Sequence, residues 1–143
     1  MSGLDALQQA LAAEHAACYV YGVLGGLVSR SRTPTLADTV DHTYGDHGRR
    51  RDELEALVRT RGATPVPAAP AYDVPRALST PTQLVEQALR VERACATSYA
   101  ALVGSVTGGT RHWAVESLTR TAIRQVDFGA APEAFPGAPE LGG

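Results

Sequence analysis

One stretch of twenty residues, Gln9–Val28, occurs twice in this 143-residue chain. Shifted by 78 positions onto Gln87–Val106, it keeps nine identical residues. The repeat predicts two related helices, each with one carboxylate, Glu14 or Glu92, near its middle. The identical pairs are Gln9/Gln87, Ala10/Ala88, Leu11/Leu89, Glu14/Glu92, Ala16/Ala94, Tyr21/Tyr99, Leu24/Leu102, Gly26/Gly104 and Val28/Val106.

The first copy of the repeat has the spacing of an amphipathic helix. From Leu4 onward, apolar residues recur three, four or seven positions apart, which predicts a helix with one face packed against partners. Glu14 falls on that face, and an unpaired buried carboxylate is costly. His15 lies off the apolar face of this helix, and His42 lies off the apolar face of the next one. We therefore expect both imidazoles to face solvent. The apolar positions are Leu4, Leu7, Leu11, Cys18, Tyr21 and Val28.

Three further helices follow from start and stop signals. Thr33 and Pro34 are an N-cap and a first helical residue, and Gly62 ends that second helix. Thr80-Pro81-Thr82-Gln83 has the pattern of a capping box and begins the third helix. The fourth helix is predicted over residues 111–128. Its expected inward residues are Val115, Leu118, Ala122 and Val126, whereas the second helix turns Val40, Thr43, His47, Arg50 and Leu54 inward.

The segment between the second and third helices contains four prolines, Pro65, Pro67, Pro70 and Pro75. A helix of about 27 residues is about 40 Å long, and a Pro-rich segment at about 3.1 Å per residue can run that distance. Short, long and short links in this order are typical of a bundle with one crossover. We therefore predict an all-α, ferritin-like four-helix bundle with a long crossover between helices 2 and 3. It occupies residues 1–129, and a Gly/Pro-rich tail, residues 130–143, lies on the surface or is disordered.

Bulk properties exclude several functions. A net charge of −2 argues against a nucleic-acid partner, which needs a strongly basic face. No apolar run is long enough to span a membrane, and the first residues lack a secretory signal, so we expect a cytoplasmic protein. We expect Cys18 and Cys95 to remain free thiols. No Gly-rich phosphate loop or nucleophile motif occurs.

Three segments carry a resemblance to a known family. They are AAEHAACYVYG (residues 12–22), DHGRRRDEL (residues 46–54) and RGATPVPAAPAY (residues 61–72). The chain resembles, from Leu4 to about Pro136, a small ferritin-like family of unknown function from high-GC (actinobacterial) genomes. The resemblance implies a four-helix ferritin-like fold and implies no activity.

The wider ferritin-like superfamily binds two iron or manganese ions with a Glu on each of two helices and Glu-x-x-His on the other two. Glu14 and Glu92 match the first two positions. The second helix offers His47 directly after Asp46, and the fourth offers Glu116 without a following His. No Glu-x-x-His occurs in the sequence. The candidate metal ligands are therefore Glu14, His47, Glu92 and Glu116, each near the middle of its helix.

The same residues also fit a core without metal. Arg50 lies one turn after His47, and these two cations can neutralise Glu14 and Glu92 if the geometry offsets desolvation. We therefore expect a non-catalytic protein that has no cofactor and whose two-metal site is degenerate or lost. The alternatives are an iron or manganese oxidase that uses the four ligands, and a helical module that binds a protein partner. A homodimer is predicted through Tyr19, Val20 and Val23.

Overall fold

The computed structural model describes residues 1–142 and consists of four long helices. In chain order they are α1 (Gly3–Leu27), α2 (Pro34–Thr60), α3 (Pro81–Ser105) and α4 (Gly108–Asp127), followed by the short 3-10 helix η1 (Pro139–Leu141). No strand occurs within the described range. The chain is an all-α four-helix bundle, as the sequence predicts.

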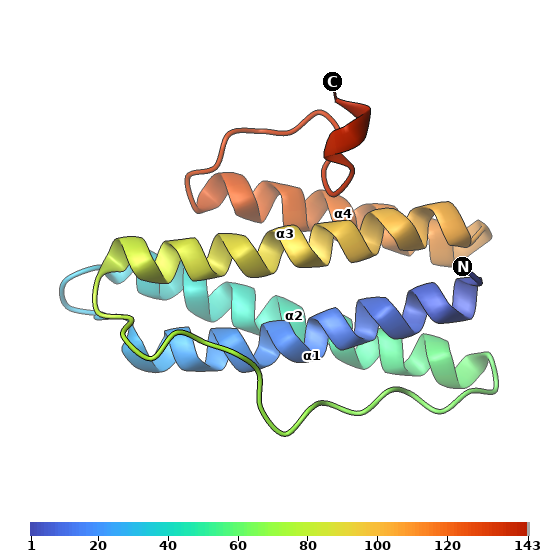
Figure 1. The fold of residues 1–143 in the computed structure, drawn as a ribbon, viewed down its shortest axis with the longest axis horizontal. Coiled ribbons are helices and arrows are strands. Elements are labelled where there is room, and N and C mark those ends of the chain that lie inside the picture. The colour runs from blue at the N-terminus through green and yellow to red at the C-terminus, as the bar shows by residue number, and fades with distance from the viewer. Residues whose placement is uncertain (143) are drawn as a thin grey trace.

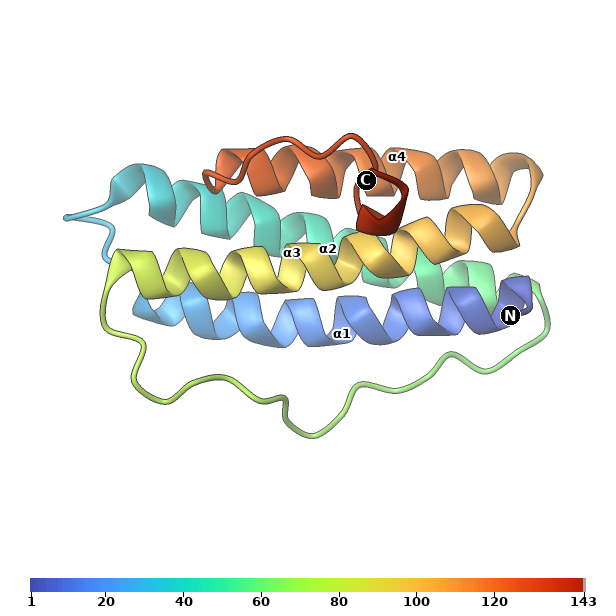
Figure 2. The same cartoon turned by 45° about the horizontal axis from the view of Figure 1, so that its top comes forward.

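The long link between α2 and α3 runs the length of the bundle (Figure 1). It carries the chain from the end of α2 back to the end at which α2 begins, so α3 runs parallel to α2 and antiparallel to α1 (Figures 1 and 2). Helix α1 packs against α2 and α3, and α3 packs against α4. The predicted crossover is confirmed.

Local sequence signals set the helix ends. The Thr80 hydroxyl accepts from the backbone N–H of Gln83, whose side chain accepts in turn from the Thr80 N–H, which completes the predicted capping box. Ser2 and Asp5 cap α1 in the same way. Thr33 occupies the N-cap position of α2, but its hydroxyl donates to the Ser29 carbonyl and does not cap the helix.

Two apolar clusters fill the bundle, one toward each end. Leu7, Leu54 and Leu102 belong to the first cluster, and Leu24 and Val40 to the second. Four buried ionisable side chains, Glu14, His47, Arg50 and Glu92, form the centre of the bundle.

Helix α4 departs from the prediction in its start and in its face. It begins at Gly108, not at Arg111, so only Val106 and Thr107 separate it from α3. Val115 and Val126, expected inside, are 43% and 44% exposed. The predicted phase was wrong by one residue, because the positions of α4 that face the core are small or polar and the more apolar residues directly follow them. The buried positions of α4 are Ala114, Ser117, Thr121 and Gln125.

The prediction that His15 faces solvent was also wrong, because the crossover covers this side chain. It is only 8% exposed, and its Nε2 lies 2.9 Å from the Val66 carbonyl oxygen. Gln8 holds the same segment, accepting from the Val66 N–H and donating to the Thr64 carbonyl. His42 is exposed, as predicted. A helix that packs on three sides needs no single apolar stripe, and this is why the spacing misassigned His15.

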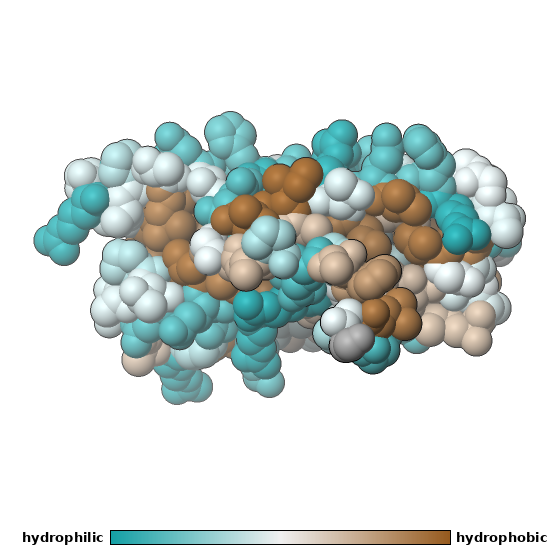
Figure 3. All heavy atoms as spheres, turned by 90° about the horizontal axis from the view of Figure 1, so that it is seen from above, coloured by the Kyte–Doolittle hydropathy of each residue, from teal (hydrophilic) through white to brown (hydrophobic). Residues whose placement is uncertain are grey.

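The face formed by α4 and the tail carries exposed apolar side chains among polar ones (Figure 3). The homodimer surface predicted on α1 is incomplete, because Val20 is buried. The homodimer itself stays a prediction. No helix in residues 1–142 is long and apolar enough to cross a membrane. The exposed apolar residues of α4 and the tail are Val115, Ile123, Val126, Phe135 and Leu141.

The C-terminal tail approaches the backbone of α3 closely at Gly137. This residue has φ +75°, and a Cβ on it would overlap the Ala96 carbonyl group and lie 2.8 Å from the Thr97 nitrogen. Gly137→Ala should therefore release the tail from α3, because strain and a clash with backbone act together. Hydrogen exchange of residues 131–141 should become faster than in the parent.

Gly129→Ala is the matched control for this substitution. Gly129 has φ +91°, but a Cβ there meets nothing within 4 Å. If hydrogen exchange of the tail is equally fast in both variants, the effect of Gly137→Ala comes from backbone strain and not from its clash with α3.

Candidate functional site

The centre of the bundle is a cluster of ionisable side chains from three helices. α1 supplies Glu14, α2 supplies His47 and Arg50, and α3 supplies Glu92. Glu14, His47 and Glu92 have no exposed area, and Arg50 is 3% exposed. The two glutamates meet because the repeat gives them matched positions on adjacent antiparallel helices.

His47 bridges the two carboxylates. Its Nδ1 lies 2.5 Å from Glu14 Oε2, and its Nε2 lies 2.8 Å from Glu92 Oε1. A carboxylate can only accept, so both ring nitrogens donate, and the imidazole is a cation. Burial by itself lowers the pKa of His47, but the charges and hydrogen bonds of Glu14 and Glu92 outweigh it and raise the pKa to about 9.

Arg50 is the second cation of the cluster. Its Nε lies 3.1 Å from Glu14 Oε1, as the sequence predicts for a core without metal. This N–H is not aimed at the carboxylate well enough to form a hydrogen bond, so the contact is an ion pair. Arg50 Nη2 lies 3.1 Å from His47 Nδ1. Because guanidinium and imidazolium have only donors, these two groups make no hydrogen bond to each other.

Two tyrosines close the cluster reciprocally. The Tyr21 hydroxyl on α1 donates to Glu92 Oε1 on α3 at 2.7 Å, and the Tyr99 hydroxyl on α3 donates to Glu14 Oε1 on α1 at 2.5 Å. Each tyrosine follows its own helix's glutamate by seven residues, about two turns. Helical side chains lean toward the N-terminus, so both hydroxyls reach back to the central level. Both hydroxyls therefore have a hydrogen-bond acceptor inside the bundle.

The four charges of the cluster cancel. Glu14 and Glu92 are negative, and His47 and Arg50 are positive. Burial raises the pKa of Glu14, but the charges of His47 and Arg50 and the hydrogen bonds from His47 and Tyr99 outweigh it and hold the pKa below its ordinary value. A neutral, hydrogen-bonded and sealed cluster holds the helices in one register and offers no side chain to a dissolved substrate.

The structure does not bring Glu116 into this cluster. Glu116 is on the outer surface of α4, with its Oε1 3.6 Å from His112 Nε2, and its side chain is 57% exposed. Two core residues escaped the sequence reasoning. Cys95 has its sulfur among the ligand atoms of Glu14 and His47, all within 4.8 Å of one another. Thr121 is fully buried on α4. The signal for Cys95 was its position three residues after Glu92 on the same face.

A pair of metal ions does not fit these residues. A metal needs a lone pair on the imidazole, but both His47 nitrogens point at carboxylate oxygens. The Arg50 cation stands beside Glu14, where a second positive ion would be repelled. His47 and Arg50 thus supply the positive charge that neutralises the two carboxylates.

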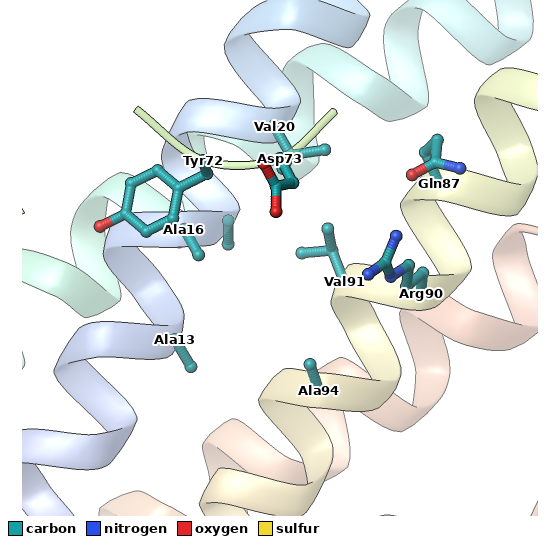
Figure 4. A pocket seen from close by; sticks show the side chains of 10 residues that line it. Ala13, Ala16, Val20, Tyr72, Asp73, Gln87, Arg90, Val91 and Ala94 are labelled. Atoms are coloured by element: carbon teal, nitrogen blue, oxygen red, sulfur yellow. The ribbon is translucent and has the colours of Figure 1, made fainter. Parts of the chain in front are cut away.

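A surface groove lies close to the cluster without reaching it. It has a volume of about 240 Å³ and runs between α1 and α3, with Tyr72 and Asp73 of the crossover at one rim and Arg90 of α3 at the other (Figure 4). Its floor includes Ala13 and Ala17, the neighbours of Glu14. Glu14 itself has no exposed area, so the groove gives no access to the carboxylates.

Comparisons with known proteins give a family and a structural relative. A family model described as Domain of unknown function (DUF4439) matches residues 6–140. A crystal structure of a conserved hypothetical protein, rv2844, from Mycobacterium tuberculosis is 31% identical, with a TM-score of 0.81 over 92% of this chain and 94% of that one. No curated protein matches the chain.

Proposed function

Because this chain belongs to the family described as Domain of unknown function (DUF4439), we propose its role from its own core: a non-catalytic, ferritin-like bundle with a structural or binding role. In the wider superfamily, carboxylates and histidines at the bundle centre hold two metal ions. Here an ion-pair cluster takes that place. We also assign the chain to a ferritin-like family of actinobacterial genomes, a view supported by its mycobacterial relative. Its cytoplasmic location stays a prediction.

One observation carries this proposal. His47 donates to Glu14 and Glu92 from both ring nitrogens, and Arg50 lies against Glu14, so the buried charges sum to zero without an added ion. A two-metal oxidase needs carboxylates that are free to bind metal and an open path for its substrate. The cluster meets neither need.

Metal content tests the proposal directly. The full chain, purified from medium supplemented with iron and manganese, should contain well below one metal ion per chain by elemental analysis. Near-stoichiometric iron or manganese that disappears in Glu14→Ala but persists in Glu116→Ala would overturn the proposal. Glu116→Ala is the matched control because that carboxylate is exposed on the outside of α4.

A single soft metal ion is the second candidate, favoured by the convergence of Glu14, His47 and Cys95. Binding would require His47 to lose a proton and Cys95 to become a thiolate. Burial and the nearby charges of Glu14 and Glu92 raise the pKa of Cys95 well above its ordinary value. Cobalt(II) added to the chain would show thiolate-to-metal absorption if this site forms, and Cys95→Ser would abolish it. The proposed function predicts no such band at neutral pH.

A further inference from the structure

The hairpin of α3 and α4 places Thr121 level with Glu92. Counting from the turn at Val106 and Thr107, Glu92 lies fourteen residues before Val106, and Thr121 lies fourteen residues after Thr107. The contact between the rings of Tyr99 and Trp113, seven residues before Val106 and six after Thr107, agrees with this register to within one residue. Glu14 has His47 as its partner in the other hairpin. Thr121 is therefore the counterpart of His47 in the second half of the bundle.

Glu92 and Thr121 each carry a buried oxygen that has no hydrogen-bond partner among the described residues. These atoms are Glu92 Oε2 and Thr121 Oγ1. Buried polar atoms are almost always satisfied, by protein or by ordered water. Other helical threonines of this chain donate to the carbonyl four residues earlier, as Thr43 does to Thr39 and Thr119 to Val115. Thr121 does not, so its hydroxyl is available to a partner in the core.

We propose that one water molecule binds between Glu92 Oε2 and Thr121 Oγ1, at the position that an imidazole takes in the other hairpin. A threonine side chain is smaller than a histidine by about the size of one water, whose share of liquid volume is about 30 Å³. The water donates to the carboxylate and accepts from, or donates to, the hydroxyl. It satisfies both oxygens of the second hairpin without a second histidine.

The charge balance of the cluster favours a neutral water molecule over a cation at this position. The two carboxylates are already neutralised by His47 and Arg50. A metal or ammonium ion at Glu92 would leave a net positive charge in a fully buried site, which is strongly unfavourable. An uncharged molecule that can donate two hydrogen bonds has no such cost.

Thr121→Val tests the site because the two possibilities predict different changes in stability. If the hydroxyl holds a bridging water, its loss should raise the unfolding equilibrium constant about tenfold, the usual scale for one hydrogen bond to a charged network. If the hydroxyl is unpaired, replacing it with a methyl group should leave the protein equally or more stable. Urea unfolding at neutral pH distinguishes these results, and the second result overturns the proposal.

Thr43→Val is the matched control on α2. Thr43 is as buried as Thr121, but its hydroxyl bonds a helical carbonyl of its own helix. The Thr39 carbonyl keeps its helical N–H partner when this hydroxyl is removed, so no buried group is left unpaired and we expect the unfolding constant to stay within about threefold of the parent. A high-resolution crystal structure of the parent chain provides the second measurement. Density about 2.8 Å from both oxygens supports the water; a direct Thr121–Glu92 hydrogen bond, a coordinated cation or no density overturns it.

Discussion

Replacing Arg50 with Met should destabilise the protein by about 3–5 kcal/mol, the usual cost of breaking a buried ion pair. Arg50 is one of two cations that balance Glu14 and Glu92, and its Nε lies 3.1 Å from Glu14 Oε1. Met keeps an unbranched chain of similar shape but removes the charge. One negative charge then stays buried without compensation. Urea unfolding at neutral pH, followed by circular dichroism, measures the loss.

Arg49→Met is the control, because this neighbour is 45% exposed and pairs with Asp46 and Glu53 at 3.4 Å. An exposed pair of this kind contributes at most about 1 kcal/mol. The double variant Glu14→Gln/Arg50→Met should recover part of the stability, because it removes both buried charges. If Arg50→Met is as stable as Arg49→Met, or if the double variant gains nothing, charge compensation does not hold this core.

Stability should fall by about 3 kcal/mol between pH 6.5 and pH 9. The pKa of His47 is about 9 in the folded chain against an ordinary value of 6.5, and each pKa unit is worth about 1.4 kcal/mol. Folding therefore favours the protonated imidazole. Its contribution is complete below pH 6.5 and is lost as the pH rises through 9.

Glu14 determines how the stability of the protein changes at acid pH. Its pKa is below the ordinary value of 4.5, so its contribution is complete above pH 4.5 and is lost as the pH falls through its folded pKa. We expect maximal stability between about pH 4.5 and pH 6.5 from these two groups. Urea unfolding across pH 4 to 9 measures the curve.

His47→Gln should remove the alkaline decline, and His42→Gln should keep it. His42 lies on the same helix, but its side chain is exposed and not part of the buried cluster, so it is the matched control. A parent protein equally stable at pH 6.5 and pH 9 would show that His47 is not held as a cation.

Much of the central cluster could be predicted from sequence, and the reason is the repeat. Matched positions of Glu14 and Glu92 on two helices of one length place both at the same depth, and the tyrosines follow at the same offset. His47 and Arg50 lie on the buried face of a helix whose caps and spacing are clear. What spacing could not give is the pairing, because hydrogen-bond direction depends on the side chains of all three helices together.

Glu116 and Thr121 on α4 show how far the inward face of a helix can be predicted from its sequence. Glu116 sits near the middle of α4, which predicted its depth but not its direction, and it faces outward beside His112. Thr121 faces the core although it is polar, while Val115 and Val126 are largely exposed. An amphipathic pattern fixes the phase of a helix only when apolar burial outweighs every other contact.

The sequence by itself determined the four helices, the crossover between α2 and α3, and the depth of the central carboxylates, since these follow from caps, prolines and a repeat along one chain. The tertiary structure alone decided which side of α4 meets the core, that Val66 covers His15, and that Gly137 lies on Ala96. These outcomes depend on contacts between segments distant in sequence. The free energy of such contacts is set by the neighbouring side chains and not by the local pattern.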